Sequence, residues 1–137
     1  MEGIIVTPLT IISHPKGDIL HGMKKSDQGF SEYGEAYFST LKFGEIKGWN
    51  KHERMVLNLI VPIGKVTFVI YDKKLNNYFE ITISPENYQR LTVSPGLWLA
   101  FKGRDQSFNL ILNIASIEHD QSEIKKLDIE KIPYKWD

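Results

Sequence analysis

The sequence contains no cysteine. This absence excludes disulfide scaffolds, thiol catalysis, cysteine-based zinc sites and iron–sulfur clusters, and it is consistent with a reducing compartment. A net charge is also missing, because 17 Lys and Arg balance 17 Asp and Glu along the chain. Without a basic stripe to neutralise phosphates, we expect no nucleic-acid partner.

Long hydrophobic runs are absent as well. The longest apolar stretch, Leu57–Ile63, is interrupted by Asn58 and Pro62, and it is far shorter than the roughly 20 residues that a membrane helix needs. The apolar run Ile4–Val6 has no basic region before it and is cut by Pro8, unlike a signal peptide. We therefore predict a cytoplasmic protein with no membrane segment.

What the sequence does contain is a series of short runs rich in Ile, Val, Phe, Tyr and Thr, separated by turn residues about every ten residues. No linker or internal repeat divides residues 1–137, so we expect one domain. This pattern is typical of an all-β sandwich or barrel. The predicted strands are Ile4–Ile12, Tyr33–Lys42, Lys47–Arg54, Val56–Val61, Lys65–Tyr71, Tyr78–Ile83, Gln89–Val93, Trp98–Lys102 and Phe108–Ala115.

The C-terminal segment follows a different pattern. Asp120–Glu123 fits a helix cap, and Ile124 and Leu127 follow at helical spacing, which predicts a short helix that ends before Pro133. The aromatic residues of the tail beyond it would gain no stabilisation from burial if they stayed in solvent. We expect this tail to lie on the barrel or on a second subunit.

The strongest candidate site is the polar strand Lys47–Arg54. A strand that is polar on both faces cannot bury both, so one face is expected to line a cavity. The alternative is an exposed edge strand that is kept polar against aggregation. Alternation places Gly48, Asn50, His52 and Arg54 on one face and Lys47, Trp49, Lys51 and Glu53 on the other.

The face with Asn50, His52 and Arg54 offers a general base beside a fixed cation. That pair suits proton abstraction next to a carbonyl, with positive charge near the enolate oxygen. No two of the four histidines have the spacing of a metal pair, so we expect no metal site. We interpret His119 as structural, because its neighbour Asp120 already serves as a helix cap.

Three segments together resemble the RmlC-like cupins of nucleotide-sugar biosynthesis, the superfamily of dTDP-4-dehydrorhamnose 3,5-epimerase and the dTDP-sugar 3,4-ketoisomerases. In order, they resemble the family's basic-Gly-x-His strand, its Gly-turn-strand ending in Asp, and its Pro-Pro-Gly turn with the following strand. Their order and spacing agree over roughly residues 17 to 115. The segments are Gly44–His52, Val61–Asp72 and Leu91–Phe101.

The resemblance implies a cupin jelly-roll β-barrel and a homodimer. It also implies a nucleotide-sugar substrate in the barrel mouth and no metal or organic cofactor. The chain departs from the metal-binding cupin pattern, since it has Asn50 where the first His of His-x-His would stand and Leu99 where a later His would stand. The catalytic His of the epimerases aligns with Asn50, whereas His52 matches the second His of the ketoisomerases.

The function implied by the resemblance is an isomerase or epimerase that acts through an enolate on a nucleotide-linked 4-keto-6-deoxy sugar, in the synthesis of surface-polysaccharide precursors. We predict His52 as the base and Tyr37 or Tyr71 as the acid. Two alternatives stay open: a 3,4-ketoisomerase, which can work with a single base, and a non-catalytic cupin module that binds sugar nucleotides.

The same resemblance suggests how the substrate is held. We predict that Lys47 and Arg54 hold the diphosphate or the enolate oxygen and that Asn50 donates a hydrogen bond to the sugar. Trp49 is predicted to contact the substrate as a stacking surface.

Overall fold

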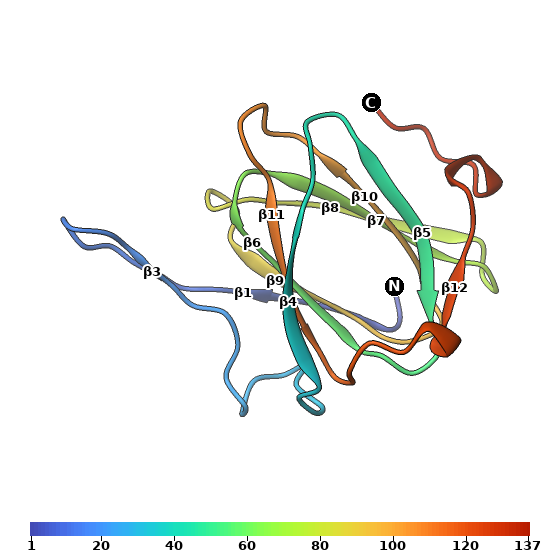
Figure 1. Cartoon of the computed structure of the whole chain (residues 1–137), viewed down its shortest axis with the longest axis horizontal. Coiled ribbons are helices and arrows are strands. Elements are labelled where there is room, and N and C mark those ends of the chain that lie inside the picture. The colour runs from blue at the N-terminus through green and yellow to red at the C-terminus, as the bar shows by residue number, and fades with distance from the viewer.

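Two antiparallel sheets of five strands face each other, and a separate two-stranded hairpin extends from them (Figure 1). This computed structural model describes all residues 1–137. The strand orders are β1-β9-β6-β11-β4 and β12-β5-β10-β7-β8, with β2-β3 as the hairpin. The arrangement is the predicted all-β cupin-like jelly roll. The elements are β1 (Ile4–Pro8), β2 (Ile11–Ile12), β3 (Ile19–Leu20), β4 (Glu35–Thr40), β5 (Ile46–His52), β6 (Leu57–Ile63), β7 (Val66–Asp72), β8 (Asn77–Ile83), β9 (Gln89–Val93), β10 (Trp98–Gly103), β11 (Leu110–Ala115) and β12 (Ile124–Lys126), with 3-10 turns η1 (Gln121–Glu123) and η2 (Ile129–Lys131).

The apolar core lies between the two sheets. Inward residues alternate with outward ones, so that β9 contributes Leu91 and Val93 to the core and turns Arg90 outward. The rings of Phe68 and Phe101 meet in this core with their centroids 5.7 Å apart. Its fifteen buried members are Leu41, Met55, Leu57, Leu59, Val61, Val66, Phe68, Ile70, Ile83, Leu91, Val93, Leu97, Leu99, Ile111 and Ala115.

A second apolar cluster covers the outer face of the sheet that contains β5. Trp49 is fully buried there, and its indole nitrogen donates a hydrogen bond of 3.1 Å to the carbonyl of Ile129. The tail packs on the same cluster through Ile132, Tyr134 and Trp136. Of the two positions expected for the tail, on the barrel or on a second subunit, the structure shows the first.

The predicted C-terminal helix is wrong. Asp120 does act as a cap, with its carboxylate accepting from the Ser122 amide at 3.0 Å, but the turn that it caps is the 3-10 turn η1. The residues after it form β12, which pairs with β5. A helix this short gains little on its own, whereas β12 satisfies backbone groups along the open edge of β5.

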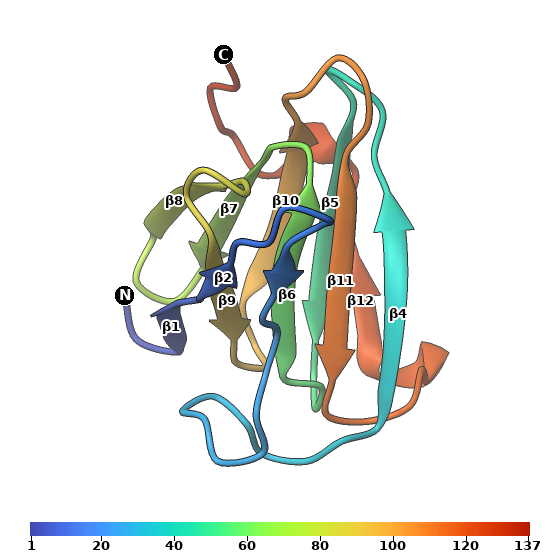
Figure 2. The same cartoon turned by 90° about the vertical axis from the view of Figure 1, so that its left-hand side faces the viewer.

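The predicted strand Ile4–Ile12 is two strands in the structure, since β1 ends at Pro8 and β2 begins at Ile11. The segment after β3 returns over the outer face of the other sheet. There the guanidinium of buried Arg90 donates to the carbonyls of Gly22 and Gln28, at 2.8 and 3.0 Å. The β2–β3 hairpin reaches away from both sheets in Figure 1 and points toward the viewer in Figure 2.

Candidate functional site

A pocket of about 390 Å³ opens between the two sheets, with residues of β4, β5 and β12 in its lining. β4 and β12 are edge strands of their sheets and lie on the same side of the molecule (Figure 2). The volume of the pocket lies in the usual range for small-molecule sites. Its lining combines several ionisable and amide side chains with a single aliphatic one. The lining residues are Glu35, Tyr37, Asn50, His52, His119, Ile124 and Lys126.

The pairing of β12 with β5 builds one wall of this pocket. Ile124 lies opposite His52, and Lys126 lies opposite Asn50. Cross-strand partners project from the same face of a sheet. All four side chains therefore point toward the space between the sheets, and Lys125 points to the outer face.

His52 forms a dyad with Glu123, which is 2% exposed. One carboxylate oxygen accepts the backbone amides of Arg54 and Met55, both at 2.9 Å. The other oxygen is in short contact with Nδ1 of His52. The carboxylate can only accept, so Nδ1 carries the proton, and Nε2 is left as the basic nitrogen.

Two opposing influences set the charge of Glu123. Burial raises the pKa of its carboxyl, whereas the hydrogen bonds from His52 and from the Arg54 and Met55 amides lower it more, so that the net pKa falls below the ordinary value. Glu123 therefore remains ionised at neutral pH, where it orients the imidazole of His52.

Tyr37 projects from β4 into the same pocket. Its hydroxyl accepts a hydrogen bond of 2.9 Å from the amide of Asn113, its cross-strand partner on β11. The base and a phenol thus come from opposite sheets, which places them on different sides of the space that a ligand would occupy.

A shift in register changes the predicted faces of β5. Leu99 of β10 pairs with Asn50 and Phe101 pairs with Lys47, so one extra residue of β5 lies between the two pairs. Phe101 faces the core, and Lys47 shares its face. Strict alternation predicts that Lys47 and Asn50 lie on different faces of β5. The ammonium of Lys47 instead reaches the Thr40 carbonyl on the facing sheet at 2.8 Å.

Three predicted site residues lie elsewhere. Tyr71 pairs with Trp98 on the outer face, where its hydroxyl donates to Asn76 at 3.1 Å. Trp49 is buried on that same face and is closed off from any substrate. The Arg54 side chain, beyond the end of β5, forms a surface ion pair of 2.8 Å with Asp120.

The structure therefore brings together His52, Asn50 and Tyr37 of the predicted set. It adds Glu123, which the sequence pattern indicates only as part of a helix cap, and it places His119 in the pocket wall. The His119 backbone amide donates to Glu35 at 3.0 Å. Acidic residues near a candidate base were visible in the sequence, but nothing there indicated which of them would reach His52.

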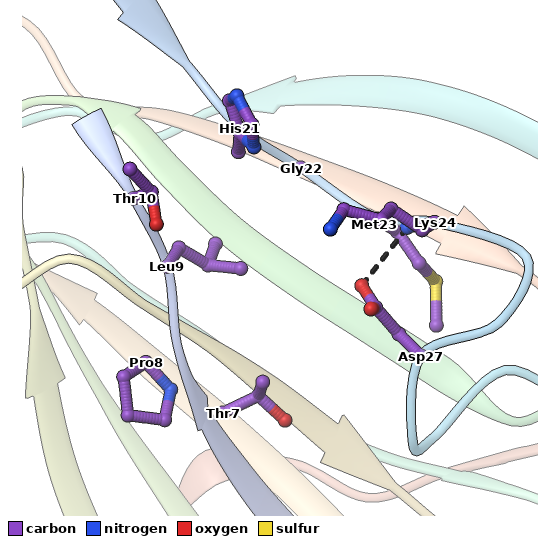
Figure 3. Close-up of a pocket in the computed structure, with 9 residues that line it drawn as sticks. All are labelled: Thr7, Pro8, Leu9, Thr10, His21, Gly22, Met23, Lys24 and Asp27. Atoms are coloured by element: carbon purple, nitrogen blue, oxygen red, sulfur yellow. Dashed lines mark hydrogen bonds between the residues drawn. The ribbon is translucent and has the colours of Figure 1, made fainter. Parts of the chain in front are cut away.

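A second cavity, of about 360 Å³, lies between the end of β1 and the segment after β3 (Figure 3). Figure 3 shows the hydrogen bond from the Lys24 amide to the Asp27 carboxylate, which is 2.9 Å long. His21 has no carboxylate to orient its ring here. The cavity between the sheets is therefore the better candidate for chemistry.

Two further observations concern the whole chain. No three His, Cys, Asp or Glu side chains lie together in a way that could hold a metal ion. No helix has the length and apolar character needed to cross a membrane.

No protein-family model and no curated protein sequence match this chain. Solved structures do. A dTDP sugar isomerase from Desulfovibrio desulfuricans G20 is 29% identical, with a TM-score of 0.92 over 98% of this chain and 91% of its own. The 3,4-ketoisomerase of Thermoanaerobacterium thermosaccharolyticum, solved with TDP-4-keto-6-deoxyglucose, is 17% identical, with a TM-score of 0.79 over 91% of this chain and 88% of its own. The dTDP-4-dehydrorhamnose 3,5-epimerase from Sulfolobus tokodaii is 16% identical, with a TM-score of 0.85 over 98% of this chain and 82% of its own.

Proposed function

Because this chain has the fold of the RmlC-like dTDP-sugar isomerases and epimerases, we propose that it isomerises or epimerises a nucleotide-linked 4-keto-6-deoxy sugar through an enolate. One observation carries the proposal. The dyad of His52 and buried Glu123 faces the same pocket as Tyr37. A base with a fixed tautomer and a phenol across from it are the groups that enolate chemistry needs.

The reaction begins at the carbon next to the ketone. Nε2 of His52 takes the C3 proton, the electrons of the C–H bond form a C3–C4 double bond, and the carbonyl electrons move to the C4 oxygen. Glu123 stabilises the imidazolium that results. Asn50, beside His52 on the pocket face, is placed to donate a hydrogen bond to a sugar oxygen.

The diphosphate needs a cation at the pocket mouth, and the structure changes the candidates for it. Arg54 is paired with Asp120, and Lys47 donates to Thr40. Lys126 is an exposed lysine of the pocket wall, and its ammonium has no hydrogen-bond or ion-pair partner in the protein. We therefore assign the diphosphate to Lys126, while the sugar lies deeper, beside His52.

The 3,4-ketoisomerase remains a second candidate. It is favoured because His52 is the single histidine of the pocket whose ring is oriented by a carboxylate. A ketoisomerase moves one proton between adjacent carbons and can use one base for both transfers. A non-catalytic sugar-nucleotide module is the third reading.

Proton exchange separates these functions. The protein is incubated in D₂O with dTDP-4-keto-6-deoxyglucose, and the C3 and C5 protons are followed by NMR, with His52→Gln as the control. Exchange at both carbons indicates a 3,5-epimerase, and exchange at C3 alone indicates a ketoisomerase or a single-site epimerase. Binding of the nucleotide sugar without any exchange would contradict the enzymatic proposal and leave the binding module.

We also propose that the chain works as a homodimer, in the cytoplasm and in the synthesis of surface-polysaccharide precursors. Tyr33 and Phe38 are each 65% exposed beside the outer face of β4 and β11, and Ile19 of the hairpin is 58% exposed. Apolar surface of this kind is typical of an interface. Sedimentation equilibrium should give the mass of a dimer, and a clean monomer would contradict this proposal.

A further inference from the structure

The hydroxyl of Tyr37 has one protein partner, the side-chain amide of Asn113. Asn113 is 3% exposed and lies directly opposite Tyr37 in the β4–β11 ladder. The distance between its amide nitrogen and the phenol oxygen is 2.9 Å. This pair lies on the sheet that faces the His52 dyad.

The orientation of the Asn113 amide is fixed from its other end. Its carbonyl oxygen accepts the backbone N–H of Asn58 at 3.0 Å. A backbone N–H can only donate, so the oxygen must point to Asn58 and the NH₂ group must point to Tyr37. A flipped amide would bring two donors together at Asn58.

This orientation decides what Tyr37 can do. Because Asn113 donates, the phenol oxygen accepts, and the Tyr37 proton is not used in that bond. No other protein group accepts this proton, and Tyr37 lines the pocket. The free O–H is therefore available to a ligand in the pocket.

We propose that Asn113 is a positioning residue that makes Tyr37 the proton donor to the enolate formed by His52; this inference rests on the proposed function. The O–H bond of Tyr37 breaks, its proton moves to the enolate, and the electron pair stays on the phenolate oxygen. The proton arrives at oxygen in a ketoisomerase and at carbon in an epimerase. The Asn113 N–H stabilises the phenolate, since a hydrogen bond to the charged form favours that form.

The test compares Asn113→Asp with Tyr37→Phe. Aspartate keeps the shape and still accepts the Asn58 amide, but it offers Tyr37 an acceptor and draws its proton away from the pocket. We expect turnover to fall by about 100-fold or more in both variants, the usual scale of a lost acid. Exchange of the C3 proton in D₂O, which needs His52, should fall much less, so the ratio of exchange to turnover rises at least about tenfold.

The double variant supplies the sharper measurement. If Asn113 acts through Tyr37, Asn113→Asp has little further effect on turnover once Tyr37 is Phe. The inference would be overturned if the losses of turnover in the two single variants multiplied in the double variant. An unchanged ratio of exchange to turnover in Asn113→Asp would also overturn it. If Asn113→Asp does not fold, Asn113→Ser, whose side chain is too short to reach both partners, is measured instead and should show the same rise in the ratio.

Asn109→Asp is the matched control. Asn109 is also a buried asparagine whose amide is fixed at both ends, but it does not line the pocket. Its oxygen accepts the backbone amides of Lys65 and Asp105 at 2.9 and 3.1 Å, and its nitrogen donates to the carbonyls of Leu41 and Asp105 at 3.0 and 2.9 Å. Its ratio of exchange to turnover should not change. A wild-type protein that exchanges no proton with any nucleotide sugar would instead remove the proposed function, and this role with it.

Discussion

The two faces of β5 differ in what covers them. On the outer face, Trp49 is closed in by the C-terminal tail, and Lys51 lies over the ring of Trp98 at 5.3 Å. On the inner face, Asn50 and His52 border an open pocket. The strand therefore contributes to stability on one side and to chemistry on the other, and the difference comes from which residues stand at alternate positions.

Both faces depend on the same C-terminal segment. Glu123, Ile124 and Lys126 complete the inner face, and Ile132 and Tyr134 complete the outer one. Changes on the inner face should therefore alter catalysis in a protein that still folds. Changes on the outer face should alter stability and leave the chemistry of the folded molecules unchanged.

The largest effect is expected at His52. His52→Gln removes the basic nitrogen but leaves a side chain that can still donate to Glu123, so turnover should fall by about 1000-fold or more with little change in unfolding. Lys51→Gln, its neighbour on the outer face, is the control and should keep full activity. Steady-state kinetics on both variants measures this, and a His52→Gln variant that turns over normally would exclude His52 as the base.

Trp49 tests the outer face. Trp49→Ala leaves a cavity under the tail and removes the hydrogen bond to Ile129, which should cost about 3–5 kcal/mol of unfolding free energy. Urea unfolding measures the loss, and kcat per folded molecule should be unchanged. A variant of normal stability with impaired kcat would show that Trp49 contributes to the site after all.

Lys125 and Lys126 form a matched pair on one strand. Lys126→Ala should raise KM for the nucleotide sugar about tenfold, as expected for a lost charge-assisted contact, with kcat nearly unchanged. Lys125→Ala, on the outer face, should change neither constant. Equal behaviour of the two variants would remove Lys126 from the diphosphate site.

The smallest effects are expected from pH, and they have opposite signs on the two faces. The pKa of Glu123 lies below its ordinary 4.5, so its stabilisation is complete above that pH and is lost as the pH falls through the folded value. On the outer face, burial and then the hydrogen bond to Glu80 raise the pKa of Tyr134 from 10.0 to about 12. Its stabilisation is complete below pH 10 and is lost as the pH rises toward about 12.

Unfolding free energies measured across pH separate these contributions. Glu123→Gln should flatten the acid side of the stability profile, and Tyr134→Phe should flatten the alkaline side. If Glu123→Gln left the acid side as steep as in the wild type, the dyad would contribute nothing to the acid sensitivity of the fold.

The strands could be predicted because their periodicity is local. Runs such as Val66–Asp72 and Gln89–Val93 have turn residues on both sides, and the structure contains both. The sequence of Ile124–Lys126 predicts helix where the structure has β12, because three residues carry too little periodicity to distinguish a helix from a strand. Its partner, the edge of β5, lies far away in the sequence.

The site was harder to predict from the sequence, because its residues also meet through contacts between distant parts of the chain. Asn50 and His52 stood out as polar residues in a strand, and Tyr37 was one of two tyrosines proposed. The face of the sheet on which Lys47 lies depends on one extra residue of β5 in its pairing with β10. The role of Glu123 depends on its contact with His52, which is 71 residues away along the chain. Neither property leaves a local signal.

The distance along the chain between His52 and Glu123 also bears on how the protein acquires activity during folding. Many of its ladders join distant segments, such as Ile4 with Val93 and His52 with Ile124. Chains rich in such non-local pairings fold on the order of milliseconds to seconds. After dilution from denaturant, turnover should therefore return no earlier than the circular-dichroism signal of the strands, since the base gains its carboxylate only when β12 has docked.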